Sequence, residues 1–161
     1  METYLNWKRE FFSNRYSIYA GNRSVGELKC ASFSRKATAT LFDKKYSFKT
    51  KGFFKEYTLV YEDNKLVGKI NHWGNKQPRT LFEDMHIKWQ YDNKSKTQWS
   101  VFDSNGMSIK YNGTRSKGSI EVRTDNYLIV LCGLFVSHYY WQAILAAVVV
   151  IFIPLWVHMF H

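Results

Sequence analysis

The stretch from Asn126 to His161 constrains the fold most, because it contains no Asp, Glu, Lys or Arg. All the formal charge of the chain, 23 Lys and Arg against 13 Asp and Glu, therefore lies in residues 1–125. A run that is apolar on every side has two stable environments, the interior of a protein or a lipid bilayer. Whatever residues 1–125 form must bury this segment or present it to a membrane.

Residues 3–123 alternate between short aromatic or β-branched segments and turn residues, without a sustained helical period. The aromatic content of 18% also favours strands, because these rings suit pleated, half-buried surfaces. We predict about twelve strands, at 3–9, 15–20, 24–30, 36–42, 45–50, 53–61, 65–71, 79–82, 85–91, 97–103, 106–111 and 118–123.

An internal repeat runs through these strands. Ile18-Tyr19, Asn22 and Val25-Gly26 recur about 42 positions later as Val60-Tyr61, Asn64 and Val67-Gly68, and a looser copy begins at Val101-Phe102. A period of about 40 residues is also typical of propeller blades, but three copies are too few to close a propeller. A closed antiparallel barrel fits three such units better.

A barrel of twelve strands has a lumen wider than its own side chains fill, so something else must occupy the middle. The segment Tyr127–Ser137 is apolar on every face, which is typical of a helix buried all round. The predicted fold is therefore mainly β: a closed antiparallel barrel of about twelve strands, spanning residues 1–137, with a hydrophobic C-terminal helix at 126–137 through the lumen.

The rest of the apolar tail has the length of a membrane span. Residues 139–157 number about nineteen, close to the number that crosses a bilayer core. Aromatic residues of the kind held at membrane interfaces flank this run: Tyr139, Tyr140, Trp141 and Trp156. We expect a hinge at Ser137-His138 and a transmembrane anchor at 139–157; the alternative is that this half packs into a soluble core or a dimer interface.

The sequence resembles the tubby-like fold, shared by tubby domains, LURP-one-related proteins and phospholipid scramblases. The segment Thr124-Asp125-Asn126-Tyr127 and the aliphatic residues after it are similar to the LURP-one-related pattern that leads into the central helix. The hairpin at 57–70 is similar to the strand–turn–strand units of that family. The resemblance implies a twelve-stranded barrel around a helix and work at membranes or lipids. The second apolar run after His138 departs from the family pattern.

The basic residues of the middle unit are candidates for lipid binding. Seven lysines are interleaved there with aromatic residues: Lys44, Lys45, Lys49, Lys51, Lys55, Lys65 and Lys69. A surface of this kind can lie against anionic headgroups. The alternative is a solvated outer face whose lysines protect strand edges from aggregation.

The sequence offers no motif for an enzyme, a metal site or a cofactor. It lacks a nucleophile elbow, a phosphate-cradling glycine loop and a zinc-protease helix motif. Cys30 and Cys132 have neither a metal-ligand spacing nor a disulfide pattern. We therefore expect no catalytic residue, no metal and no cofactor.

The leading hypothesis is a non-enzymatic, membrane-associated β-barrel module that binds anionic phospholipid or a membrane protein partner. Its charges, with Arg115, Lys117 and Arg123 before the span and none after it, predict a cytoplasmic barrel on a single-pass anchor. One alternative is a scramblase-like lipid transporter. Another is an accessory subunit of a membrane complex, which the small residues Ala143, Ala146 and Ala147 would suit. Nucleic acid is not expected as a partner, because no recognised motif accompanies the charge.

Overall fold

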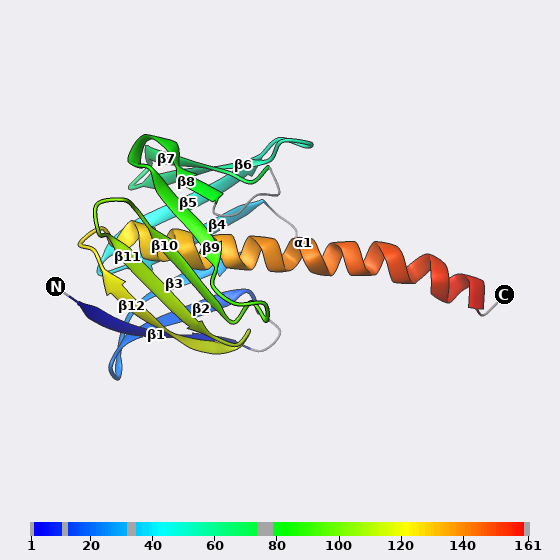
Figure 1. Ribbon diagram of the computed structural model, residues 1–161, viewed down its shortest axis with the longest axis horizontal. Helices are drawn as coiled ribbons and strands as arrows, with labels where there is room; N and C mark the ends of the chain where they lie inside the picture. Colours follow the sequence, from blue (N-terminus) through cyan, green and yellow to red (C-terminus); the bar gives the residue numbers. More distant parts are fainter. Residues whose placement is uncertain (1, 11–12, 32–34, 74–78, 160–161) are drawn as a thin grey trace.

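A computed structural model describes residues 2–10, 13–31, 35–73 and 79–159. Twelve strands form one antiparallel sheet that curves around a single long helix (Figure 1). The elements are β1 (Thr3–Arg9), β2 (Arg15–Ala20), β3 (Arg23–Cys30), β4 (Lys36–Leu41), β5 (Lys44–Lys51), β6 (Tyr57–Glu62), β7 (Lys65–Asn71), β8 (Arg79–Phe82), the 3-10 helix η1 (Glu83–Met85), β9 (Ile87–Tyr91), β10 (Gln98–Phe102), β11 (Ser108–Gly113), β12 (Lys117–Arg123) and α1 (Tyr127–Met159).

The strand order is β7-β6-β5-β4-β3-β2-β1-β12-β11-β10-β9-β8. The first and last strands of the chain, β1 and β12, are hydrogen-bonded neighbours, so the sheet nearly closes into the predicted barrel. The two ends of the order, β7 and β8, meet at a seam that side chains fill. The ring of Phe82 lies where a Cβ on Gly68 would stand, 1.8 Å from that position.

The strands form because their apolar residues recur at every second position and face one side. On β1, Leu5 and Trp7 are buried while the neighbours Tyr4, Asn6 and Lys8 are exposed. The same alternation continues around the barrel, so a single apolar core fills the inside.

The sequence repeat corresponds to two equivalent hairpins. The β2–β3 pair shifts register between Ile18 and Tyr19, and the β6–β7 pair shifts between Val60 and Tyr61, the matching positions of the repeat. Such a bulge bends a strand and increases its twist, which a closing sheet requires. The looser third copy is the β10–β11 hairpin, whose register is regular.

The turns correct two predicted strands. The strand predicted at 53–61 begins only at Tyr57, because Gly52 has φ +87° and the chain folds back so tightly that a Cβ there would lie 2.6 Å from the carbonyl oxygen of Lys55. Phe53 and Phe54 therefore lie in an exposed loop. The strand predicted at 85–91 begins at Ile87, since η1 covers Met85 and His86 has φ +52°.

The first part of α1 fills the lumen, as predicted for 126–137. Residues Leu128–Val136 are buried. The ring of Phe135 stacks on Phe48 of β5, with centroids 4.6 Å apart. On the opposite wall the hydroxyl of Tyr111 donates a hydrogen bond to the carbonyl oxygen of Val130 at 2.8 Å. Strands from both halves of the chain thus contact the helix and hold it in the lumen.

The predicted hinge at Ser137-His138 is wrong, because α1 runs without interruption from Tyr127 to Met159 (Figure 1). Neither residue is a helix breaker, and the imidazole of His138 is held in the barrel by the hydroxyl of Tyr16, 2.8 Å from Nδ1. Near Ser137-His138 the helix keeps its direction, and its residues change from buried to exposed.

Candidate functional site

The helix passes from buried to exposed within two turns. His138 is the last buried residue of α1, Tyr139–Gln142 are half-buried, and from Leu145 to Met159 every residue is exposed. Among the described residues α1 is the one helix long and apolar enough to cross a membrane. The part beyond the barrel, from Gln142 to Met159, is about 27 Å long at 1.5 Å per residue.

We call the end of the barrel from which α1 leaves the exit end. Neighbouring strands are antiparallel, so every second loop lies there, and the described residues of these loops are 10, 13–14, 31, 35, 52–56, 72–73, 92–97 and 114–116. The other connections, including those at 21–22, 42–43, 63–64 and 103–107, lie at the opposite end, close to the start of α1 (Figure 1).

Three aromatic residues of α1 contact the barrel as the helix leaves it. Tyr139 stacks on His72 with centroids 3.8 Å apart, and Tyr140 packs on Trp89 at 5.3 Å. The guanidinium carbon of Arg115 lies 3.2 Å from the ring centroid of Trp141. The structure thus places Tyr139, Tyr140 and Trp141 at the rim of the barrel, whereas Trp156 is exposed far from it. Their role at a membrane interface stays a prediction.

The loop between β5 and β6 is tied to the helix. Glu56 accepts hydrogen bonds from Arg35 and from the hydroxyl of Tyr139. Arg35 also donates to the carbonyl oxygen of Gly52 at 2.6 Å. These bonds fix the loop whose tip presents Phe53 and Phe54, which are 84% and 91% exposed. Two large rings are therefore held in solvent at the exit end.

The loops at the two ends of the barrel differ in charge. The described loops of the exit end contain Glu10, Glu56 and Asp92 as well as cations. We call the cations that form no salt bridge there, with Lys51 at the adjoining end of β5, the basic rim: Lys51, Lys55, Lys94, Lys96 and Arg115. Within the described part of the chain, none of them forms a salt bridge. The opposite-end loops hold carboxylates, at Asp43, Asp63, Asp84, Asp103 and Asp125, and the cations at that end, such as Lys44 and Lys65, lie on the adjoining strand ends.

The seven lysines predicted to bind lipid do not form one patch. Lys44 and Lys65 lie at the opposite end, where Lys44 pairs with Glu62 at 2.8 Å. Strand β5 carries Lys45 and Lys49 up the outer wall, and Lys69 lies on β7. Only Lys51 and Lys55 reach the exit end. Lys94, Lys96 and Arg115 were missed, because the loops that bring them to the same rim are far apart in sequence.

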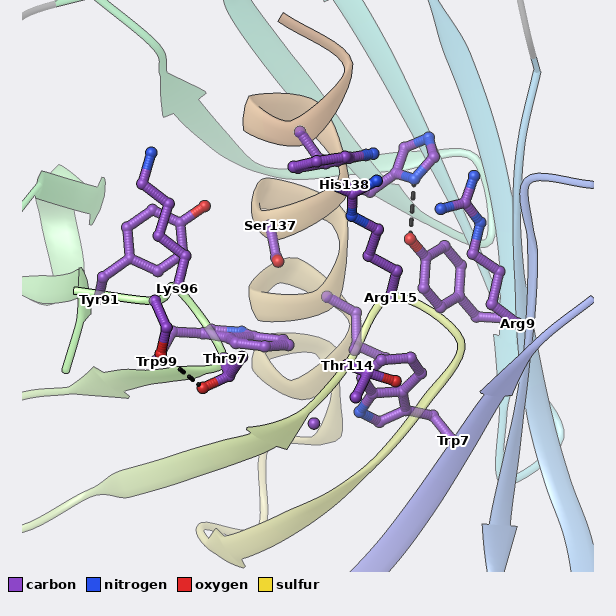
Figure 2. Close-up of a pocket in the computed structure, with 15 residues that line it drawn as sticks. Trp7, Arg9, Tyr91, Lys96, Thr97, Trp99, Thr114, Arg115, Ser137 and His138 are labelled. Carbon is purple, nitrogen blue, oxygen red and sulfur yellow. Dashed lines mark hydrogen bonds between the residues drawn. The ribbon is translucent and has the colours of Figure 1, made fainter. Parts of the chain in front are cut away.

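A cavity of about 270 Å³ opens beside α1 at the exit end, and we call it the mouth cavity. Its aromatic wall includes Trp7, Tyr16, Tyr91, Trp99 and Trp141. Figure 2 shows Arg9 and Arg115 on one side of the helix near His138, and Lys96 on the other side with Tyr91 and Trp99.

The described residues contain no cluster of three or more His, Cys, Asp or Glu that could hold a metal ion. The two histidines in the barrel interior have structural partners. His72 Nε2 lies 2.7 Å from the hydroxyl of Thr58, and His138 Nδ1 bonds to Tyr16. Burial raises the pKa of the Tyr16 hydroxyl well above its usual range, so this hydroxyl stays protonated.

No protein-family model, curated protein or solved structure matches the chain. The resemblance to the tubby-like and LURP-one-related proteins therefore stays a prediction, and function has to be argued from the geometry of the exit end.

Proposed function

We propose that this protein is a non-enzymatic, single-pass membrane protein whose barrel is held against anionic phospholipid by α1. The observation that carries the proposal is the coincidence of three features at one end of the barrel. The exposed apolar helix, the basic rim and the exposed Phe53-Phe54 loop all lie at the exit end.

The helix supplies the anchoring energy. Its exposed part is close to the thickness of a bilayer core, and an exposed apolar surface of this length is unstable in water. Placed in a bilayer, it would set the exit end against the headgroups. The rim aromatics Tyr139, Tyr140 and Trp141 would then lie at the depth where such rings are favoured.

The charge polarity supports the orientation of the barrel. Each Lys or Arg near an anionic surface is worth about 1 kcal/mol, and the cations of the basic rim have no carboxylate partners to compete for them. The carboxylates at the opposite end would face away from the membrane. Since Lys and Arg before a span favour the cytoplasmic side, we propose that the barrel is cytoplasmic.

The first test is extraction with alkaline carbonate, which removes peripheral proteins and leaves spanning ones. We expect the full chain to stay in the membrane pellet. Release into the supernatant would show that α1 does not span.

The second test measures which end of the barrel faces the membrane. A spin label on Phe54→Cys, in the full chain reconstituted in anionic vesicles, should collide with oxygen dissolved in the lipid more than with a water-soluble nickel reagent. Asn105→Cys, at the opposite end, is the matched control and should show the reverse. Equal exposure of both labels to the nickel reagent would contradict the proposed orientation.

A helix partner in the membrane is the second candidate. Ala143, Ala146 and Ala147 are exposed on α1, and small residues let helices approach closely. Cross-linking of the reconstituted chain alone, against the chain in native membranes, separates the two candidates, because only an accessory subunit would be captured with a partner.

A further inference from the structure

The mouth cavity has a one-sided charge. The cations Arg9, Lys96 and Arg115 line it, and no Asp or Glu does. Arg9 is held by its neighbours, since its Nη2 donates to the side-chain oxygen of Asn14 at 2.9 Å and its Nε to the carbonyl oxygen of Ser13 at 3.1 Å. The positive field of the cavity is therefore not neutralised by its own wall, and it favours an anion.

Three ring nitrogens behind the wall have no hydrogen-bond partner among the described residues. The indole nitrogens of Trp7 and Trp99 and Nε2 of His138 are buried without a hydrogen-bond partner. The other ring nitrogen of His138, Nδ1, lies 2.8 Å from the Tyr16 hydroxyl, and either group can supply the proton of this hydrogen bond. A ligand in the cavity meets the cations Arg9, Lys96 and Arg115, because the three ring nitrogens are buried behind the wall, and arginine and lysine only donate. A ligand that matches this wall must bring acceptors, as phosphate oxygens do.

The size and position of the mouth cavity further limit the class of ligand that fits it. A cavity of about 270 Å³ is at the small end for ligand pockets, so it suits a headgroup and not a whole lipid. Trp141 lines the cavity, and the exposed apolar surface of α1 begins within one turn of it. The acyl chains of a lipid whose headgroup lies in the cavity can therefore run along the helix into the bilayer.

We infer that the mouth cavity binds the phosphate-bearing headgroup of one anionic phospholipid. The inference deepens the proposed function and rests on it for the source of the ligand. Arg115 lines the cavity, and its guanidinium carbon lies 3.2 Å from the ring centroid of Trp141, so it lies where α1 leaves the barrel.

The test titrates the full chain in a nonionic detergent with three probes: dihexanoyl phosphatidic acid, dihexanoyl phosphatidylcholine and inorganic phosphate. Trp7, Trp99 and Trp141 line the cavity, so tryptophan fluorescence reports its occupancy. We expect a saturable response to the anionic lipid, and a weaker response to the zwitterionic lipid and to phosphate alone.

The chain offers a matched pair of variants for this titration. Lys96→Gln with Arg115→Gln removes two cavity cations. Lys8→Gln with Lys117→Gln removes the same charge from the exit ends of β1 and β12, outside both the cavity and the basic rim. We expect the first pair to weaken binding about tenfold or more, as the loss of hydrogen bonds to a charged group does, and the second pair to weaken it less than about twofold.

Three outcomes would overturn the inference. Equal weakening by both pairs would assign binding to the general charge of the exit end, and equal affinity for inorganic phosphate would assign the cavity to a soluble anion. Absence of any saturable response would leave the cavity without a ligand of this class. If the first pair does not fold, Lys96→Gln alone, at an exposed side chain, replaces it. Carbonate extraction and spin-label depth do not depend on the cavity, so the proposed function can stand or fail separately.

Discussion

The phenol of Tyr111 occupies the space that a side chain at Gly133 would need. A Cβ on Gly133 would lie 2.2 Å from the Tyr111 hydroxyl oxygen, which donates to the carbonyl oxygen of Val130 one turn earlier in α1. The same ring stacks on Trp99, with centroids 5.1 Å apart and an angle of 5° between the planes. This contact fixes both the depth and the rotation of α1 in the lumen.

Gly133→Ala should therefore destabilise the barrel by about 1–3 kcal/mol, the usual cost of forcing an extra group into a close-packed core. Tyr111→Phe should cost about 1 kcal/mol through the lost hydrogen bond. Urea unfolding of the detergent-solubilised chain measures both. Lys110→Ala, at the exposed neighbour of Tyr111 on β11, is the control and should change stability by less than about 0.5 kcal/mol. A similar loss in the control would mean that the contact with α1 is not the cause.

A second prediction concerns the seam between β7 and β8, which Phe82 closes by packing on Gly68. Phe82→Ala should cost about 3–5 kcal/mol by leaving a cavity where backbone pairing is absent between the two strands. Hydrogen exchange should show faster opening of β7 and β8 than of β1 and β12, which pair with each other. Phe54→Ala, at an exposed ring, is the matched control and should leave stability and exchange unchanged.

The two cysteines should be slow to react in the folded protein. Cys132 is completely buried in α1, and burial raises the pKa of the Cys30 thiol to about 12, against a smaller opposing effect of Arg9. At neutral pH the reactive thiolate is therefore rare at Cys30. Alkylation with iodoacetamide, followed by mass spectrometry, should modify both thiols in urea and neither within minutes under native conditions. Rapid native alkylation of Cys30 would show that the end of β3 opens locally. In that case the spin label would also react with Cys30, and the labels at Phe54→Cys and Asn105→Cys would not be specific.

Most of the barrel could be predicted from sequence because local rules set it. Alternation fixes which residues face inward, and tight turns such as Asp63-Asn64, with φ +46° and +67°, mark the ends of the strands. The strand predictions failed where a backbone turn overrode the pattern of side chains. Phe53 and Phe54 have strand-like side chains, yet the backbone turn at Gly52 excludes them from β6.

The candidate site was harder to predict, because it depends on which loops share an end of the barrel. Lys96 and Arg115 lie in different loops, and only the alternation of strand direction brings these loops to the same end beside α1. The lysines of β5 and its neighbours are close in sequence, but the extended strand spreads them over the height of the wall. The usable signal was the sign of charge in alternate loops, which can be read once the strands are assigned.

The membrane role of α1 can be tested without disturbing the barrel, since residues 128–138 hold the helix in the lumen and the exposed part begins later. Val150 and Ile151 lie near the middle of that exposed part and are 70% and 59% exposed. Replacing both with Arg should raise the free energy of insertion by about 5–7 kcal/mol, at about 2.5–3.5 kcal/mol per charge at the centre of a span.

The Val150→Arg, Ile151→Arg chain should then be released by alkaline carbonate, while its circular dichroism keeps the strand signal of the barrel. Val150→Leu with Ile151→Leu, which preserves an apolar surface, should stay in the membrane pellet. Retention of the Arg variant would contradict a spanning helix. Loss of the strand signal would instead show that the exposed part of α1 supports the fold, because residues 128–138 alone would then be insufficient to hold the lumen closed.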